Sequence, residues 1–232
     1  MTLFGYGHPA VAPTWAVERT MLDPCCWIDH ARGFLEGADQ LLLDLDDNMD
    51  WFRGRRLMYG TWHREPRRTA IEAKPGALLP EVVAGLRATL SAHYDMAFQG
   101  LFCNYYETGK DSVAWHADRI GRTEIDPLVA IVSLGGPRTF RLRPTQRGAD
   151  GASGDSQQSS HSVVLASGDL LVMGGATQHH WEHAIPKTAQ AAPRMSVTMR
   201  ASGRTSSNGA GSNSATQRPR WDPQDELLGV RR

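Results

Sequence analysis

Two stretches in the first half of the chain repeat apolar side chains at steps of three and four residues. From Phe34 to Phe52 the apolar positions follow this spacing, and acidic residues fill much of the rest. From Leu79 to Tyr94 the same spacing recurs, with Pro80 near the first turn, where a missing N–H costs nothing. Side chains three or four residues apart share one face of a helix. Both stretches are therefore predicted to be amphipathic helices, the first with an acidic outer face.

Beyond Gly100 the hydrophobic period shortens and turn residues recur. The short, strand-like segments cover residues 101–106, 112–116, 128–134, 139–142, 161–165, 170–173, 178–183 and 195–199. An earlier stretch, Leu22 to Trp27, has the apolar bunching of another short strand. About eight short strands separated by Gly and Pro are typical of a sandwich or jelly roll.

Three segments lack a hydrophobic period. Residues 1–14 are rich in Gly and Pro, residues 147–160 are polar and lie between two predicted strands, and residues 202–217 are a Ser, Gly, Asn and Thr tract. Such composition cannot bury a core, so these segments are predicted to be irregular. The 232 residues otherwise suit one domain.

Composition and charge set limits on partners and location. Lysine plus arginine total 25 and aspartate plus glutamate total 25, so attraction to nucleic acid must come from local patches. We find no apolar run long enough to cross a bilayer and no signal-like N-terminus, and therefore expect a cytoplasmic protein without membrane contact. Nothing in the sequence implies an oligomer, so a monomer is expected.

The three cysteines do not form a metal-binding pattern in the sequence. Cys25 and Cys26 are adjacent and Cys103 is distant, whereas a zinc site calls for paired spacing and a fourth ligand. Buried apolar packing is the expected role of all three.

A basic and aromatic segment follows the first predicted helix. Residues 53–68 combine seven Arg and His residues with Tyr59 and Trp62. This mixture suits a surface that binds phosphates and stacks on bases. Composition alone favours a solvated loop whose arginines pair with the preceding acidic helix.

The candidate chemistry lies between residues 115 and 200. His116 and Asp118 are two apart on an extended segment, so both side chains point to one side. Together with a distant histidine they would form the two-His, one-carboxylate set that binds non-haem iron(II). His179, His180 and His183 are the candidates for that histidine. Arg194 and Arg200, six residues apart, would share a strand face, and guanidinium groups bind carboxylates in bidentate fashion.

These motifs follow one another in a recognisable order. Asn104-Tyr105-Tyr106, His116-Ala117-Asp118, His183 and the segment from Arg194 to Arg200 resemble the marks of the AlkB family of Fe(II)- and 2-oxoglutarate-dependent dioxygenases. The resemblance implies a mostly β fold with flanking α-helices, namely a double-stranded β-helix (jelly roll) preceded by N-terminal helices and a lid. It divides the chain into an extension with lid and supporting helices (1–97), the dioxygenase core (98–201), and a disordered or loosely docked tail (202–232).

The resemblance also implies a role for each site residue. His116, Asp118 and His183 would bind iron, the late histidine being chosen by the match and not by geometry. Arg194 and Tyr106 would bind the distal carboxylate of 2-oxoglutarate, and Asn104 and Arg200 would steady its chelating end. Ser196 stands where the family has Asn. The family's lid contains a Pro-Arg pair, matched by Pro66-Arg67, which makes Tyr59, Trp62, Arg67 and Arg68 the expected substrate-binding residues.

One departure concerns recognition of the base. Several relatives have an acidic residue soon after His-x-Asp, whereas Arg119 follows Asp118 here. An acidic reader of the base would have to be Glu124 or Asp126, or be absent.

The function implied is oxidative dealkylation of N-alkylated bases in DNA or RNA. It would use Fe(II), 2-oxoglutarate and dioxygen, with ascorbate as an aid in vitro. A 2-oxoglutarate-dependent hydroxylase of a protein or small molecule is one alternative, because fold and ligand set do not determine the substrate. A jelly-roll binding module without turnover is the other.

Overall fold

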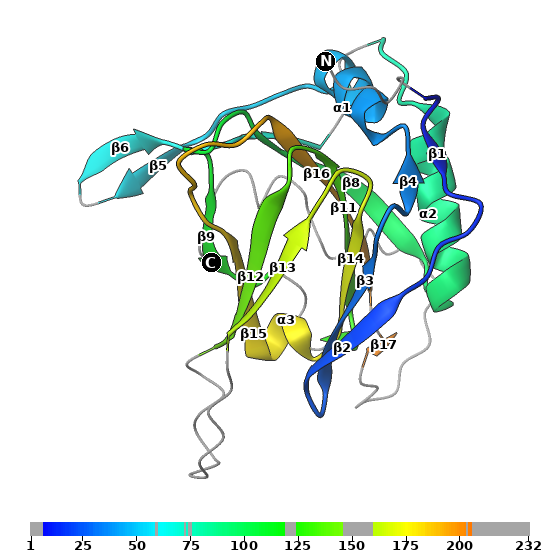
Figure 1. Ribbon diagram of the computed structural model, residues 1–232. Coiled ribbons are helices and arrows are strands. Elements are labelled where there is room, and N and C mark those ends of the chain that lie inside the picture. The colour runs from blue at the N-terminus through cyan, green and yellow to red at the C-terminus, as the bar shows by residue number, and fades with distance from the viewer. Residues whose placement is uncertain are drawn as a thin grey trace, which may run out of the picture.

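The computed structural model of the protein describes residues 7–58, 60–71, 73, 76–118, 124–145, 160–202 and 204–205. Residues 147–159 of the predicted polar segment and most of the predicted tail lie outside these residues. Within them, strands predominate over helices, as the short hydrophobic period predicts (Figure 1).

The larger of two main sheets takes strands from both halves of the chain. Its seven strands are antiparallel and run in the order β2 (Glu18–Asp23), β3 (Cys26–Ala31), β14 (Leu170–Gly175), β11 (Leu128–Gly135), β16 (Arg194–Ala201), β8 (Phe98–Tyr106) and β7 (Arg68–Ala70). The strands before residue 98 therefore complete the same sheet as the later ones. The domain boundaries expected from the sequence stay a prediction.

A smaller sheet faces the larger one. Its four strands run in the order β13 (His161–Leu165), β12 (Arg138–Pro144), β15 (Trp181–Ile185) and β9 (Val113–His116). In Figure 1 the smaller sheet, with β9, β12, β13 and β15, lies to the left of strands β3, β11 and β14 of the larger sheet. This double-sheet arrangement is the predicted jelly roll.

Among the described residues, three further strand pairs lie outside the two sheets. They are β1 (Ala10–Val11) with β4 (Leu35–Glu36), β10 (Glu124–Ile125) with β17 (Arg204–Thr205), and β5 (Arg55–Met58) with β6 (Thr61–Arg64). The β5–β6 hairpin stands away from the sheets at the upper left of Figure 1.

Two helices cover the outer face of the larger sheet. Helix α1 (Ala38–Asn48) contacts β11, and α2 (Glu81–Tyr94) contacts β8. Both lie within the stretches predicted to be helical. The first begins later than its hydrophobic pattern, because Leu35–Glu36 pairs with β1 and Gly37 takes a left-handed conformation with φ of 63°.

The larger sheet is buried on both faces, and β11 shows how. Ala130 and Val132 pack with the helices in one core cluster, whereas Val129 and Ile131 point between the two sheets into another. Because strand side chains alternate, one apolar strand serves both cores. The space between the sheets is where alternate residues of β8, β11 and β16 meet the smaller sheet.

Three local predictions are wrong. Residues 22–27 are not one strand, because β2 ends at Asp23 and β3 begins at Cys26. In the turn between them, Pro24 has no N–H to donate and Asp23 Oδ1 accepts the N–H of Cys25 at 2.9 Å. Residues 178–183 are not one strand, because α3 (Thr177–His180) precedes β15 after Gly175 turns the chain with φ of 63°. Residues 1–14, predicted to be irregular, contain strand β1, which pairs with β4.

Candidate active site

A pocket opens between the two sheets, and strands of both sheets line it. Its lining residues are Arg67, Phe102, Asn104, Tyr106, Val113, His116, Asp118, Ile131, Phe140, His183, Ile185, Arg194, Ser196, Thr198 and Arg200. Polar groups thus converge in a cavity that is otherwise apolar, as in ligand sites of globular proteins.

Three possible metal ligands meet on the side of the smaller sheet. His116 of β9 and His183 of β15 are cross-strand partners, and their ring centroids are 4.2 Å apart. Asp118 Oδ1 lies 3.7 Å from Nε2 of each imidazole. All three ligand atoms lie within 4.8 Å of one another. With metal–ligand bonds of about 2.0 to 2.2 Å, one ion between them could contact all three.

Burial favours the neutral form of His183, and a backbone contact orients the ring of His116. His116 Nδ1 lies 2.9 Å from the carbonyl oxygen of Ala114, which can accept a hydrogen bond from a protonated Nδ1. Burial, reinforced by the neighbouring His116, lowers the pKa of His183 to about 3. Phe140 stacks on the His183 ring at a centroid distance of 5.2 Å. A neutral, oriented imidazole is the form that binds a metal ion.

Asp118 is buried and yet ionised. Burial by itself would raise its pKa, but the guanidinium of Arg200 and the two imidazoles outweigh burial and lower the pKa to about 2. Arg200 donates from Nη2 and Nε to Asp118 Oδ2, at 3.0 and 3.2 Å. Gln178 accepts the backbone N–H of Asp118 at 2.9 Å, which holds the residue in place. The carboxylate therefore keeps Oδ1 directed at the two histidines.

A buried cation forms the opposite end of the pocket. Arg194 is 1% exposed and donates from Nε to Ser133 Oγ at 3.2 Å. Its Nη2 has no hydrogen-bond partner among the described residues, and its guanidinium lies 5.2 Å from the ring of Tyr106. An unmatched charged donor in a buried pocket is costly, so an anionic ligand is the expected partner.

Strands β8 and β16 place the remaining polar groups by simple pairing. Tyr106 lies opposite Arg194 and Asn104 opposite Ser196, so alternate residues of both strands face the pocket. Arg67 donates from Nε to Asn104 Oδ1 at 2.6 Å. Arg194 and Arg200 both line the pocket, as their even spacing on one strand predicts.

Comparisons with known proteins assign this arrangement to a family. Residues 48–207 match the family model described as 2OG-Fe(II) oxygenase superfamily. The alpha-ketoglutarate-dependent dioxygenase alkB homolog 3 of Mus musculus is 30% identical over 208 residues, which are 82% of this chain and 68% of that protein. The chain belongs to the AlkB family of Fe(II)- and 2-oxoglutarate-dependent dioxygenases.

Two further likenesses accompany this match. The DNA oxidative demethylase ALKBH2 of Homo sapiens is 28% identical over 213 residues, covering 84% of this chain and 80% of that protein. The solved structure titled "The structure of OsALKBH1" has a TM-score of 0.49 and 14% identity, with 79% of this chain and 99% of that chain covered.

The pocket of this AlkB-family enzyme fits the two groups that the family name implies. Two imidazoles and a carboxylate are the donor set of a non-haem iron(II) site. The buried guanidinium of Arg194, with its unmatched Nη2, suits a carboxylate of 2-oxoglutarate. Enzymatic oxidation by this class of enzyme is therefore consistent with the side chains that the pocket presents.

Of the three candidate histidines, the fold brings only His183 to Asp118 among the described residues. His179 and His180 are exposed on α3, and neither lines the pocket. His179 Nε2 lies 3.1 Å from the backbone oxygen of Glu124. The choice of His183 by family match agrees with the geometry.

The predicted substrate-binding residues do not lie together. Arg67 lines the pocket, whereas Arg68 forms ion pairs with Asp46 of α1 at 2.9 Å and Glu107 at 3.1 Å. Arg68 thus follows the alternative reading, in which the basic segment pairs with the acidic helix. Trp62 is 64% exposed on β6, and Tyr59 lies outside the described residues.

Neither proposed acidic reader of the base lines the pocket. Glu124 is in β10, and Asp126 is exposed in the turn that follows, with φ of 54°. Residues 119–123, which directly follow Asp118, lie outside the described residues. We therefore assign no base-reading role to Glu124 or Asp126.

Sequence reasoning missed several residues that shape the pocket. Phe102 and Thr198 line it from β8 and β16, and Gln178 holds Asp118 from α3. The first two were accessible from alternation, because each lies two residues from a predicted site residue. Gln178 carried no such signal, since its contact joins residues 60 positions apart.

No helix among the described residues is long and apolar enough to cross a membrane.

Proposed function

We propose that this dioxygenase removes alkyl groups from the nitrogens of bases in DNA or RNA by oxidative dealkylation. The similarity to the human DNA oxidative demethylase ALKBH2 supports this proposal. So does the exposed, cationic and aromatic hairpin beside the pocket, which is the observation that carries it.

The hairpin has the chemistry of a nucleic-acid surface. All four residues of β6 are exposed, and Arg55 of β5 lies directly opposite Arg64. Two like charges in cross-strand positions destabilise a hairpin unless an anion lies between them. By strand alternation, Trp62 shares the face of Arg64, so one face offers both phosphate contacts and a ring for stacking.

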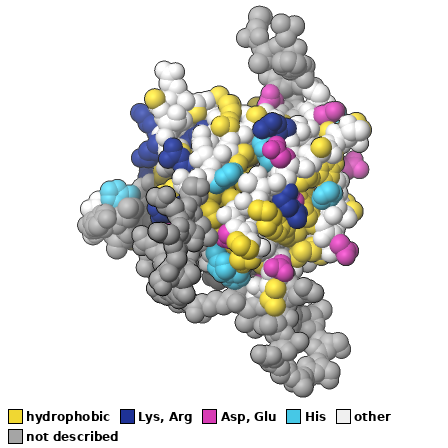
Figure 2. Space-filling model, turned by 60° about the horizontal axis from the view of Figure 1, so that its bottom comes forward, with side chains coloured by type: hydrophobic (Ala, Val, Ile, Leu, Met, Phe, Trp, Pro, Cys, Tyr) yellow, Lys and Arg dark blue, Asp and Glu magenta, His cyan; other side chains and the backbone are white. Residues whose placement is uncertain are grey.

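The hairpin joins the body of the protein next to the pocket. Arg67, three residues after the end of β6, lines the pocket, and the carbonyl of Pro66 accepts the N–H of Ser112 at 2.8 Å. Figure 2 shows Lys and Arg side chains gathered on the left of the molecule, the side from which the hairpin projects in Figure 1. A strand bound there would lie within reach of the pocket although the chain has zero formal net charge.

In the proposed site, His116, Asp118 and His183 would hold iron(II). Arg194, with Tyr106, would hold the distal carboxylate of 2-oxoglutarate, while Asn104 and Arg200 would steady its other end. Ser196 is shorter than the family's Asn and offers one hydroxyl in its place. The chemistry supplied by iron(II), 2-oxoglutarate and dioxygen is oxidation of the alkyl carbon, after which an aldehyde leaves and the base is restored.

The protein's own contribution is placement and charge. Arg200 keeps Asp118 ionised, Phe140 and Ala114 orient the two imidazoles, and the apolar walls Ile131 and Ile185 exclude water. These groups are in place before a substrate arrives, so little reorganisation accompanies the reaction.

The test is mass spectrometry of short oligonucleotides that carry different N-methyl bases, in single- and double-stranded form. Each is incubated with the protein, iron(II), 2-oxoglutarate and ascorbate, and succinate is measured alongside. Loss of a methyl group together with succinate formation is the expected result. Succinate without demethylation would favour a protein or small-molecule hydroxylase, and no succinate would favour a binding module.

The expected monomer and cytoplasmic location also stay predictions. Analytical ultracentrifugation with and without an oligonucleotide would decide the first, and imaging in cells the second.

A further inference from the structure

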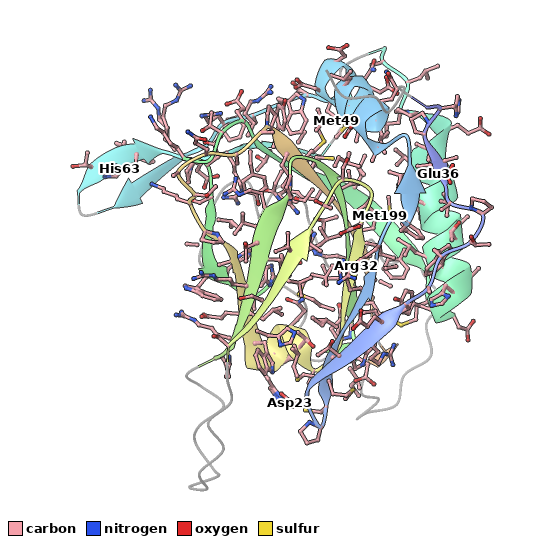
Figure 3. All side chains as sticks on the ribbon, viewed as in Figure 1. Asp23, Arg32, Glu36, Met49, His63 and Met199 are labelled. Atoms are coloured by element: carbon pink, nitrogen blue, oxygen red, sulfur yellow. The ribbon has the colours of Figure 1, made fainter. Side chains whose placement is uncertain are left out.

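A second cluster of possible metal ligands lies at the tip of the β2–β3 hairpin, outside the pocket. Asp23 ends β2, Cys26 begins β3, and Cys25 is in the turn between them. His180, the last residue of α3, meets this turn. Figure 3 labels Asp23 at the hairpin tip, where the ribbon of α3 also lies.

The four side chains come as close as the ligands of one tetrahedral ion. Cys25 Sγ lies 3.5 Å from His180 Nδ1, 3.8 Å from Cys26 Sγ and 3.3 Å from Asp23 Oδ1. Cys26 Sγ lies 3.8 Å from His180 Nδ1. The four ligand atoms all lie within 4.8 Å of one another.

These distances match the geometry of zinc. With zinc–sulfur bonds of about 2.3 Å and zinc–nitrogen bonds of about 2.0 Å, a tetrahedron has edges of about 3.8 Å between sulfurs and about 3.5 Å between sulfur and nitrogen. The observed distances differ from these edges by no more than about 0.3 Å. Little movement would be needed to bind an ion.

The backbone holds the ligands in position from both sides. Asp23 Oδ1 accepts the N–H of Cys25 at 2.9 Å, and the carbonyl of Cys25 accepts the N–H of Ala176 at 2.9 Å. Trp181 donates from Nε1 to Asp23 Oδ2 at 2.7 Å, as outer partners of metal-binding carboxylates do. The hydrogen bonds from Ala176 and Trp181 therefore hold Cys25 and Asp23 by groups outside the four ligands.

Apolar packing accounts for Cys26 and Cys103, which lie in the two core clusters, but not for Cys25. Cys26 and Cys103 are buried, but Cys25 is exposed, which corrects the expectation that all three pack in the core. The paired spacing that the sequence lacks is supplied by the fold, because His180 comes from 155 positions away. Cys103 belongs to neither of the two clusters of possible metal ligands found among the described residues.

We propose that Asp23, Cys25, Cys26 and His180 form a structural site for a thiophilic divalent cation, with zinc the best fit. Two thiolates, one imidazole and one carboxylate favour zinc, whereas the nitrogen and oxygen set of the active site suits iron(II). Two thiol protons leave to solvent as the cation binds, and no redox step is involved.

The site would tie the start of β3 to the corner between α3 and β15. Strand β15 carries His183, three residues after His180. A bound cation would thus stiffen the strand that supplies one iron ligand, without touching the active-site pocket itself. This inference does not depend on the proposed substrate.

The test uses the full chain, fully reduced and stripped of metal, and cobalt(II) as a spectroscopic substitute for zinc. A thiolate-to-cobalt charge-transfer band is expected for the wild type, and the active-site ligand set, which lacks sulfur, cannot produce it. Cys25→Ser should weaken the band strongly, and His180→Ala should alter the tetrahedral d–d bands. His179→Ala, an exposed neighbour outside the cluster, is the matched control and should behave as the wild type.

Zinc affinity and thermal unfolding supply an independent readout. Loss of a direct ligand in Cys25→Ser or His180→Ala should weaken zinc affinity by at least about tenfold to a hundredfold, the range seen even for outer partners. Zinc should raise the Tm of the wild type by mass action, and much less that of the two variants. Both substituted residues are exposed, so circular dichroism should show folded variants.

Three results would overturn the proposal. The first is a reduced wild type without a sulfur-to-cobalt band at saturating cobalt. The second is zinc affinity equal to wild type in both ligand variants. The third is a Cys25–Cys26 disulfide in the purified protein whose reduction restores no metal binding.

Discussion

The pocket and the β5–β6 hairpin differ in how firmly the fold holds their side chains. Arg194, Ser196 and Arg200 lie on β16, which is hydrogen-bonded to β11 on one edge and β8 on the other. Strands β5 and β6 pair only with each other among the described strands, and β6 is exposed throughout. The side chains proposed to bind a metal and 2-oxoglutarate thus lie on a strand paired along both edges. Those proposed to bind nucleic acid lie on a hairpin exposed to solvent.

This contrast has an energetic side. Substitutions in the pocket would remove metal ligands and charged hydrogen bonds from a buried site, where each lost interaction costs much binding free energy. Changes on the hairpin remove contacts in solvent, where each is worth less. Removing a side chain from the pocket should therefore lower binding or activity more than removing one from the hairpin.

The largest expected effect is that of His183→Ala. Removing the buried imidazole should abolish iron(II) binding, measured by titration of the metal-free protein, and with it succinate formation. His179→Ala should retain both, because its side chain is exposed and outside the cluster. The ligand assignment is wrong if His183→Ala still binds iron as the wild type does.

Arg194→Ala should raise the KM for 2-oxoglutarate strongly. A lost charged hydrogen bond costs about 1.5 to 3 kcal/mol, or roughly ten- to a hundredfold in affinity. Arg194→Lys should rescue only part, because an ammonium cannot reproduce the two donors of the guanidinium edge. An unchanged KM in Arg194→Ala would remove this residue from the co-substrate site.

Trp62→Ala should weaken binding to a methylated single strand by about 1 to 3 kcal/mol if the ring stacks on a base. Its Tm should stay close to that of the wild type, because the side chain is 64% exposed. Leu78→Ala, at an apolar position that is 86% exposed outside the hairpin, is the control and should bind normally. Fluorescence anisotropy measures both. Equal affinity in the two variants would exclude stacking by Trp62.

Arg55→Ala combined with Arg64→Ala should flatten the salt dependence of binding. Each lost single-strand phosphate contact lowers the slope of log K against log salt by roughly 0.7. Removing two cations that face each other should also relieve repulsion in the free hairpin. A slope identical to wild type would mean that this face does not meet phosphates.

Arg68→Ala should have the smallest effect. Its guanidinium pairs with Asp46 and Glu107 and is 25% exposed, so the salt slope should not change and stability should fall by about 0 to 1 kcal/mol. Urea unfolding measures the second quantity. A flattened salt slope in this variant would return Arg68 to the proposed binding surface.

Local geometry explains how much of the fold and site could be predicted from the sequence. Helical spacing locates α2, and strand alternation places Arg194 and Arg200 on one side of β16. Both periods are properties of the backbone alone, so they can be recognised in the sequence without knowing which strands or helices pack nearby. Where a single glycine turns the chain, as at Gly37 and Gly175, the hydrophobic pattern continues past the true end of the element.

The sequence by itself therefore determined the class of fold, the order of the motifs and the side of each strand that faces the pocket. Only the tertiary structure decided which of three neighbouring histidines reaches Asp118, that Arg68 turns to Asp46 instead of solvent, and that His180 meets Cys25 and Cys26. The reason is physical. Periodicity is fixed by neighbours along the backbone, whereas ion pairs and ligand clusters depend on which strands pair across long stretches of chain, and many pairings leave the local pattern unchanged.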